Sequence, residues 1–313
     1  MCLIALALDQ QRRFPLVIAA NRDEFFDRPA ARLAWWAPSP DAPAILAGRD
    51  LQAGGTWLGL NAAGRMAMLT NLRRPARPEA GAPSRGGIVP LWLRGELRAD
   101  RFWAQIAQSD HNPFTLIAAD FANGECWWGT LAEPAPRRLE RGLYGLSNAA
   151  LDTPRPKVER LKLAMRAALV RADSTKQLAQ ALFAALADRT PVADAALPQT
   201  GIAIEREREL ASAFIRSPEL RYGTRCSTLV ITERIHKRLV SQVFERTFSV
   251  SGGVALLRQA SLRDWPPRYD TGEPSVAPLG PVHDAELDDA AEHAAPAAPR
   301  KRVRSLLKPA HPR

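Results

Sequence analysis

Cys2 follows the initiator methionine, and this position gives it chemistry that an internal cysteine lacks. If Met1 is removed, Cys2 carries a thiol and the free α-amine of the chain on one carbon. An α-amine titrates near ~8 and a cysteine thiol near ~8.5, so either group can be tuned to work at neutral pH. The pair is therefore a nucleophile with its own base. The alternative is a small buried side chain at the start of a strand, the commoner fate of a cysteine in an arbitrary chain.

A polar segment, Asn21-Arg22-Asp23-Glu24, is expected to lie beside this amino terminus. Residues 3–8 are predicted to form a buried strand, 9–13 a turn, and 15–20 the returning strand. An antiparallel return brings the polar segment back toward the start of the chain. Asp23 and Arg22 either serve this site or form only a structural ion pair.

A second predicted hairpin ends in an amide side chain. Its strands are expected over 56–60 and 66–71, joined by a turn at 61–64, so that Asn71 closes it. A Pro- and Arg-rich loop, 73–87, follows and is too long to be a mere connection. Its bases (Arg73, Arg74, Arg77 and Arg85) are suited to an anionic ligand such as a carboxylate, a coenzyme A phosphate or a haem propionate. The alternative is a solvated basic rim.

The remaining elements alternate between strands and helices. Residues 28–38 are predicted to be a loop whose tryptophans pack on the core, and 190–220 are predicted to be irregular. Short helices are expected over 88–95 and 99–108, and longer ones after Pro154 and after a capping box at 174–177. Further strands are expected over 114–120, 126–128, 136–147, 222–232 and 239–249. Because strands cluster at both ends of the folded part, these ends are expected to share a sheet in an α+β sandwich.

Composition bounds the class of protein. The chain has 313 residues, 46% of them hydrophobic, which suffices for a sizeable core. No apolar run approaches the ~20 residues that cross a bilayer, and no signal peptide is recognised, so a cytoplasmic protein without a transmembrane segment is expected. Three distant cysteines, Cys2, Cys126 and Cys226, suggest neither a disulfide framework nor a zinc site.

The net charge of +10 belongs to residues 1–270. Residues 271–299 carry six acids and no Lys or Arg, and residues 300–313 carry six bases and no acid, so the two segments cancel. Single-sign charge blocks rich in Pro and Ala predict a disordered tail over 271–313, after a folded domain over 1–270. A diffuse basic surface without an aromatic-basic motif does not indicate nucleic-acid binding.

Other kinds of site find little support. Residues 145–149, Gly-Leu-Ser-Asn-Ala, resemble a nucleophile elbow but lack its final glycine. No G-x-G-x-x-G or Walker loop is present. The five histidines are scattered, three of them beyond residue 270, so a histidine-built metal site is not expected.

Several ordered motifs together resemble one family. They are Met1-Cys2, residues 20–25 (Ala-Asn-Arg-Asp-Glu-Phe), residues 54–59 (Gly-Gly-Thr-Trp-Leu-Gly), Thr70-Asn71, residues 145–148 (Gly-Leu-Ser-Asn) and residues 222–225 (Tyr-Gly-Thr-Arg). This pattern is similar to that of the NRDE proteins, the family of transport and Golgi organisation protein 2, over roughly residues 1–250. One departure is Arg155, where the pattern has a tryptophan.

The resemblance implies a fold and a set of roles. The family resembles N-terminal nucleophile hydrolases, four-layer αββα sandwiches of antiparallel sheets. By resemblance, Cys2 is the nucleophile, Asp23 orients its amine, and Asn71 stabilises an oxyanion. Asn148 holds the amine or the substrate carbonyl, and Arg225 polarises the site. Substrate binding is assigned to Arg22, Glu24, Trp57, Arg73 and Arg74.

Two functions follow from this resemblance. The first is a cysteine amidohydrolase or acyltransferase that acts on a small acyl amide or thioester without a cofactor or metal. The second is a non-catalytic protein on the same scaffold that binds haem or an acyl-coenzyme A, as family members are implicated in haem trafficking and in lipid metabolism. The sequence does not indicate an oligomeric state.

Overall fold

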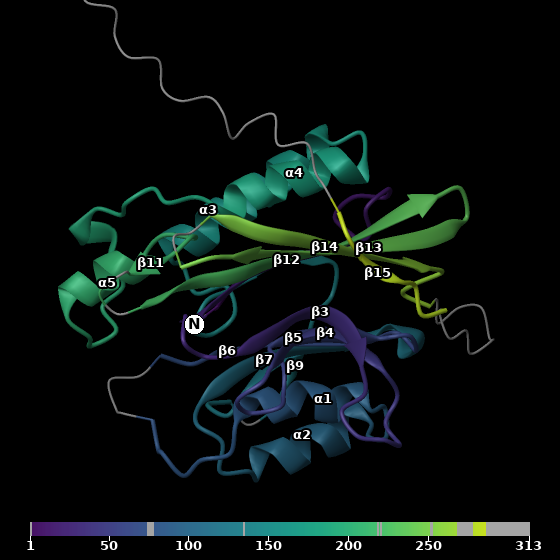
Figure 1. The fold of residues 1–313 in the computed structure, drawn as a ribbon, viewed down its shortest axis with the longest axis horizontal. Helices are drawn as coiled ribbons and strands as arrows, with labels where there is room; N and C mark the ends of the chain where they lie inside the picture. The colour runs from purple at the N-terminus through teal and green to yellow at the C-terminus, as the bar shows by residue number, and fades with distance from the viewer. Residues whose placement is uncertain are drawn as a thin grey trace, which may run out of the picture.

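Side chains of the first two strands are buried on both faces. In β1 (Cys2–Leu8) and β2 (Leu16–Phe25), Ile4 and Ile18 join one apolar cluster, whereas Leu3 and Val17 join another. A sheet that is apolar on both faces must be covered on both. The computed structural model shows how: two antiparallel sheets pack face to face, and helices cover their outer faces (Figure 1). This confirms the α+β, four-layer αββα sandwich.

The structure describes residues 2–73, 78–133, 135–217, 219, 221–250, 253–267 and 278–285, without the side chains of residues 2 and 255. In this part, no helix is both long and apolar enough to span a bilayer. The boundary predicted at residue 270 stays a prediction. Of the predicted tail, residues 278–285 include strand β15 (Val282–Asp284), and the rest lies outside the described residues.

The first sheet joins both ends of the folded chain, as predicted. Its order is β10 (Gly142–Leu146), β1, β2, β12 (Tyr222–Ile235), β13 (Arg238–Phe248), β14 (Val254–Arg263) and β15, with β11 (Arg216–Ser217) paired to β12. The β1–β2 and β12–β13 pairs are the first and last predicted hairpins. Outside this sheet lie α3 (Pro156–Arg171), α4 (Thr175–Leu186) and, near β11, α5 (Ile204–Leu210) (Figure 1).

The second sheet is built from the intervening sequence. Its order is β3 (Ala30–Trp36), β4 (Ile45–Asp50), β5 (Leu58–Asn61), β6 (Arg65–Asn71), β7 (Phe114–Asp120), β8 (Glu125–Thr130) and β9 (Arg137–Arg138). Its outer face is covered by α1 (Ile88–Leu93) and α2 (Ala99–Ala107). Short 3₁₀ turns η1 (Arg85–Gly87), η2 (Phe121–Asn123) and η3 (Asp194–Ala196) complete the elements.

Three local predictions were wrong. A loop was predicted over 28–38, but this segment contains strand β3. The strand was missed because it lies at the edge of its sheet, is only partly buried and shows no clear apolar alternation. The single strand predicted over 136–147 is two strands in different sheets, β9 and β10, and the buried Leu139 lies where the chain crosses between them. The region 190–220 contains α5, whose mostly charged sequence conceals a short helix.

A close approach between β8 and α2 tests this packing. A Cβ atom at Gly129 would lie 2.1 Å from Cη2 of the buried Trp103 ring and 2.6 Å from its Cζ2. We expect Gly129→Ala to lower the free energy of unfolding by about 1–3 kcal/mol, because the buried indole must move. Urea unfolding at an unchanged m-value measures this. Gly87→Ala is the matched control, since Gly87 has an ordinary φ of −73° and a Cβ there meets no described atom within 4 Å. Equal midpoints for both variants would contradict the packing.

Candidate functional site

Strand register brings the start of β1 to the polar end of β2. Cys2 pairs with Arg22, and on the other side of β2 Asp23 pairs with Thr224 and Arg22 with Cys226. A bulge between Thr224 and Cys226 accommodates Arg225 as an extra residue. The side chain of Cys2 lies outside the described part, but its strand position is directly beside Arg22 and one residue from Asp23. The hairpin geometry predicted from the sequence is thus present.

A pocket of about 400 Å³ opens at this point between the two sheets. Five residues predicted to be catalytic or substrate-binding line it: Arg22, Asp23, Glu24, Trp57 and Asn71. The other lining residues include Asp50 of β4, Arg85 of η1, and three loop residues: Arg28 after β2, Thr56 before β5 and Asn112 before β7. We take this pocket as the candidate functional site.

Arg22 is held in the wall of this pocket by an aromatic ring. Its guanidinium carbon lies 4.3 Å from the ring centre of Trp57, and its Nη2 lies 3.7 Å from Asp50 Oδ2 and 3.9 Å from Glu24 Oε2. Asp50 is closer to Arg28, with 2.7 Å between Oδ2 and Nε. Arg22 Nη1 is buried and has no hydrogen-bond partner among the described residues. Arg22 is therefore a stacked cation only loosely neutralised by carboxylates.

Asp23 is fully buried next to this wall. Thr224 Oγ1 donates to Asp23 Oδ1 at 2.7 Å, and the Tyr222 hydroxyl donates to the Asp23 carbonyl at 3.0 Å. Burial raises the pKa of the Asp23 carboxyl, and the positive charge of Lys157 opposes this rise. Lys157 is itself buried and donates to the Leu210 carbonyl at 2.9 Å. Asp23 is thus a fixed, desolvated acid at the end of β2.

Asn71 and Asn148 join the two sheets. Asn148 Nδ2 donates to the Asn71 carbonyl at 2.9 Å, and the Asn148 backbone carbonyl accepts from the Arg73 N–H at 2.9 Å. Asn148 is buried and has a φ of 56°, a conformation that asparagine tolerates better than most residues. Asn148 therefore sits behind Asn71, and it is Asn71 that lines the pocket.

Two predicted residues lie elsewhere, and a third is outside the described part of the chain. Arg225 donates from Nη1 to the carbonyls of Phe25 at 2.6 Å and Arg28 at 2.9 Å, so it holds the turn after β2. Burial and the nearby Arg22 lower its pKa. Arg73 forms an ion pair of 2.6 Å with Glu207 Oε2 instead of lining the pocket. Arg74 lies outside the described residues.

Sequence reasoning missed Glu245, which lies between the sheets behind Arg22. Its Oε1 accepts from the Leu33 N–H of the opposite sheet at 2.7 Å, and the Cys226 thiol also donates to the carboxylate. Burial raises its pKa to about 7, against the opposing effects of these hydrogen bonds and of Arg22. The available signal was its position: along β13, Glu245 follows Val243 on the inward-facing alternation, where an acid is unexpected.

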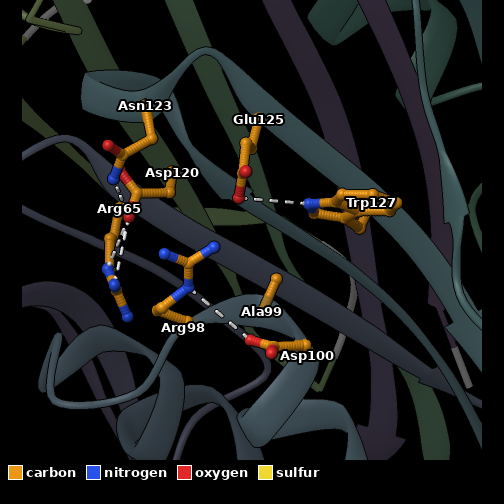
Figure 2. A pocket seen from close by; sticks show the side chains of 8 residues that line it. All are labelled: Arg65, Arg98, Ala99, Asp100, Asp120, Asn123, Glu125 and Trp127. Atoms are coloured by element: carbon orange, nitrogen blue, oxygen red, sulfur yellow. Dashed lines mark hydrogen bonds and ion pairs between the residues drawn. The ribbon is translucent and has the colours of Figure 1, made fainter.

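A second pocket, of about 380 Å³, lies at the far end of β7 and β8 (Figure 2). Four of its five charged residues are paired with one another: Arg65 and Asp120 lie 3.0 Å apart, and Arg98 and Asp100 3.8 Å apart. The fifth, Glu125, accepts a hydrogen bond from Trp127 Nε1. None of the residues predicted to be catalytic or substrate-binding lines it. It is therefore a weaker candidate than the pocket at the end of β2.

Two antiparallel sheets between helical layers, with the amino-terminal strand inside one sheet, define a four-layer αββα sandwich. The chain belongs to the Transport and Golgi organisation 2 family, whose profile matches residues 1–249.

Curated relatives extend over most of the chain. The human Transport and Golgi organization protein 2 homolog is 32% identical and the mouse homolog 31%, each over 253 residues that cover 74% of this chain and 89% of the relative. A mutant conjugated bile acid hydrolase from Clostridium perfringens, a solved structure, is 12% identical, with a TM-score of 0.34 over 76% of this chain and 90% of that one. A likeness at that level carries no argument.

The buried acid Glu245 makes stability depend on pH. Between about pH 4.5, the ordinary value for Glu, and about pH 7, the folded protein keeps a proton that the unfolded chain has released. This group therefore makes folding less favourable as the pH rises. We expect the free energy of unfolding of Glu245→Gln, relative to the wild type, to increase by about 3 kcal/mol across this window.

Urea unfolding at about pH 5 and about pH 8 measures the difference. Glu140→Gln is the control, because 78% of that side chain is exposed. If the wild type and Glu245→Gln respond to pH in parallel, Glu245 is not the buried acid described here.

Proposed function

We propose that this protein is a cysteine amidohydrolase or acyltransferase of the N-terminal nucleophile type, acting on a small acyl amide or thioester. The observation that carries the proposal is strand register: Cys2 pairs with Arg22, beside the pocket that Arg22, Asp23 and Asn71 line. Family membership supports the same assignment, because the motifs that contribute these residues lie within the matched region.

The proposed reaction begins with removal of Met1. The freed α-amine of Cys2 takes the proton of its own thiol, and the sulfur attacks the acyl carbon of the substrate. A C–S bond forms and the carbonyl oxygen becomes an oxyanion. Collapse of this intermediate breaks the C–N bond, and the α-ammonium returns its proton to the departing amine. Water, or an acceptor amine, then attacks the thioester and regenerates the thiol.

The described side chains suit these steps. The stacked guanidinium of Arg22 favours a thiolate next to it. The amide of Asn71 faces the pocket, and one donor placed where an oxyanion develops is worth about 3 kcal/mol of the barrier. Asp23, one residue along β2, is the group we assign to orient the amine. Asn148 is then a positioning residue that fixes Asn71, and Arg225 is a positioning residue that fixes the turn after β2.

The alternative, a non-catalytic protein that binds haem or an acyl-coenzyme A, fits less well for haem. A haem iron needs a His, Cys, Met or Tyr axial ligand. Among the described side chains that line the pocket there is none, so Cys2, whose strand position is beside the pocket, is the residue left to ligate the iron. Most of the described lining is polar or charged, which suits the large apolar macrocycle less well than a small polar substrate. The other alternative is a protein that binds an acyl-coenzyme A without turning it over. The following experiment distinguishes this protein from an enzyme, because only an enzyme needs a reactive Cys2.

Cys2→Ala tests the proposed nucleophile. Intact mass of the purified protein is expected to show loss of Met1, and an electrophilic acyl probe is expected to label one site per chain at residue 2. Cys2→Ala is expected to abolish both labelling and amide turnover, since no other group supplies the sulfur. Cys126→Ala is the control: Cys126 is buried with its pKa raised to about 12 by burial, so its loss is expected to leave labelling unchanged. Retention of Met1, or full turnover by Cys2→Ala, would contradict the enzyme.

Asp23→Asn tests the orienting role. The change keeps the size of the side chain and removes its charge, so we expect the rate of acyl labelling at neutral pH to fall roughly 10²-fold, within the usual effect of a proton-transfer group. The rate against pH is the measurement, with Asp100→Asn, whose side chain is 71% exposed, as the matched control. Identical rates for both variants would remove Asp23 from the mechanism.

A further inference from the structure

Two buried arginines lie near one carboxylate behind the pocket. Arg73 Nη1 lies 2.6 Å from Glu207 Oε2, with the two side chains only 7% and 4% exposed. The other carboxylate oxygen of Glu207 accepts from the Thr200 hydroxyl. Arg155 is 7% exposed and lies near enough for the charges of Arg73 and Glu207 to affect its pKa. Glu207 is therefore already occupied by Arg73 and Thr200, and Arg155 forms no hydrogen bond or ion pair with it.

Arg155 is the group left over. Its Nε is buried without a hydrogen-bond partner, and none of the described residues forms an ion pair with its side chain. Burial, together with the positive charge of Arg73, lowers its pKa to about 10. Breaking or omitting one partner of a buried ion pair is strongly destabilising, so a buried guanidinium normally has a counterion.

Neighbouring groups add to the positive potential rather than cancel it. Arg155 is the N-cap of α3, a helix of 16 residues, and makes no side-chain cap. The N-terminal end of a helix favours anions. Lys157, two residues further on, already donates to Leu210 and lies near Asp23. Arg206 is paired with Glu209 at 2.7 Å. The described surroundings therefore offer no spare anion to Arg155.

This cluster adjoins the candidate site through β6. Arg73 is two residues beyond Asn71, and its backbone N–H donates to the carbonyl of Asn148. The side chain of Asn148 in turn donates to the backbone carbonyl of Asn71. Glu207 comes from α5, which lies at one end of the first sheet near β11 (Figure 1). The two guanidinium groups thus lie next to the strand end that carries Asn71, although they are not part of the described lining of the pocket.

We propose that Arg155 and Arg73 form an oxyanion-binding subsite that takes a carboxylate or phosphate group of the ligand. Guanidinium groups suit such groups because their planar N–H forks match two oxygens. Glu207 holds Arg73 in place and competes with the ligand for it. The inference concerns binding and does not depend on whether Cys2 reacts.

Opposite effects of two charge-removing variants test the subsite. Inorganic phosphate and glutarate are titrated against the full chain by calorimetry, and the rise in Tm with each is measured. We expect saturable binding to the wild type, at least 10-fold weaker binding to Arg155→Gln, and binding several-fold tighter to Glu207→Gln, because Arg73 is then released. A preference between the two probes distinguishes a phosphate-bearing ligand from a carboxylic acid.

Arg155→Lys and Arg98→Gln complete the set. Arg155→Lys keeps the charge, is expected to retain part of the binding, and serves in place of Arg155→Gln if the latter does not fold. Arg98 is 89% exposed, so Arg98→Gln is expected to bind as the wild type does. Cys2→Ala is expected to bind both probes unchanged, which separates this subsite from the proposed chemistry. The subsite is overturned if neither probe binds, or if Arg155→Gln and Arg155→Lys both bind as tightly as the wild type.

Discussion

The pairing of β2 with β1 on one side and β12 on the other is the constraint on which the site depends. Side chains alternate along a strand, so a slip of one residue would exchange the faces of Arg22 and Asp23. In the observed register, Arg22 faces the second sheet and stacks on Trp57, while Asp23 receives the hydroxyl of Thr224 on the other face. Apolar residues along both faces of β2 hold this register, because the residues of one face belong to one buried cluster and those of the other face to another.

The second constraint is the junction between the sheets. Asn148, two residues beyond the end of β10 in the first sheet, donates to the carbonyl of Asn71 at the end of β6 in the second, so one buried amide sets how the two strand ends meet. Further along the interface, Glu245 of the first sheet accepts from the backbone of Leu33 in the second. Polar contacts of this kind have fixed geometry, whereas the apolar contacts around them are nondirectional. They therefore set the shape of the pocket more sharply than the core does.

The family resemblance supplied the four-layer αββα arrangement, and five of the ten proposed residues line the same pocket. Local patterns were enough to predict the hairpins and an α+β sandwich. They failed where tertiary context overrides local preference. The partly buried β3 has no distinct period, and Leu139 gives no sign in the sequence that the chain changes sheets there. Arg73 was assigned to the pocket from its place in the basic loop after Asn71, and Arg225 from its motif. A long side chain is placed by its partners, here Glu207 for Arg73 and the carbonyls after β2 for Arg225, and sequence spacing does not reveal these partners.

The charges at this end of the sandwich are not arranged for stability. Elsewhere, pairs such as Arg208 with Asp194 are exposed and contribute little. Here Arg22 and Arg155 are buried with nitrogens that have no described partner, and Asp23 and Glu245 are desolvated enough to raise their pKa values. Each group costs folding free energy that an apolar residue of similar size would save. Arg22 and Asp23 line the candidate pocket, whereas Glu245 lies behind Arg22, and Arg155 lies near Arg73. Packing alone gives no reason to keep these buried charges, and such groups cluster at functional sites.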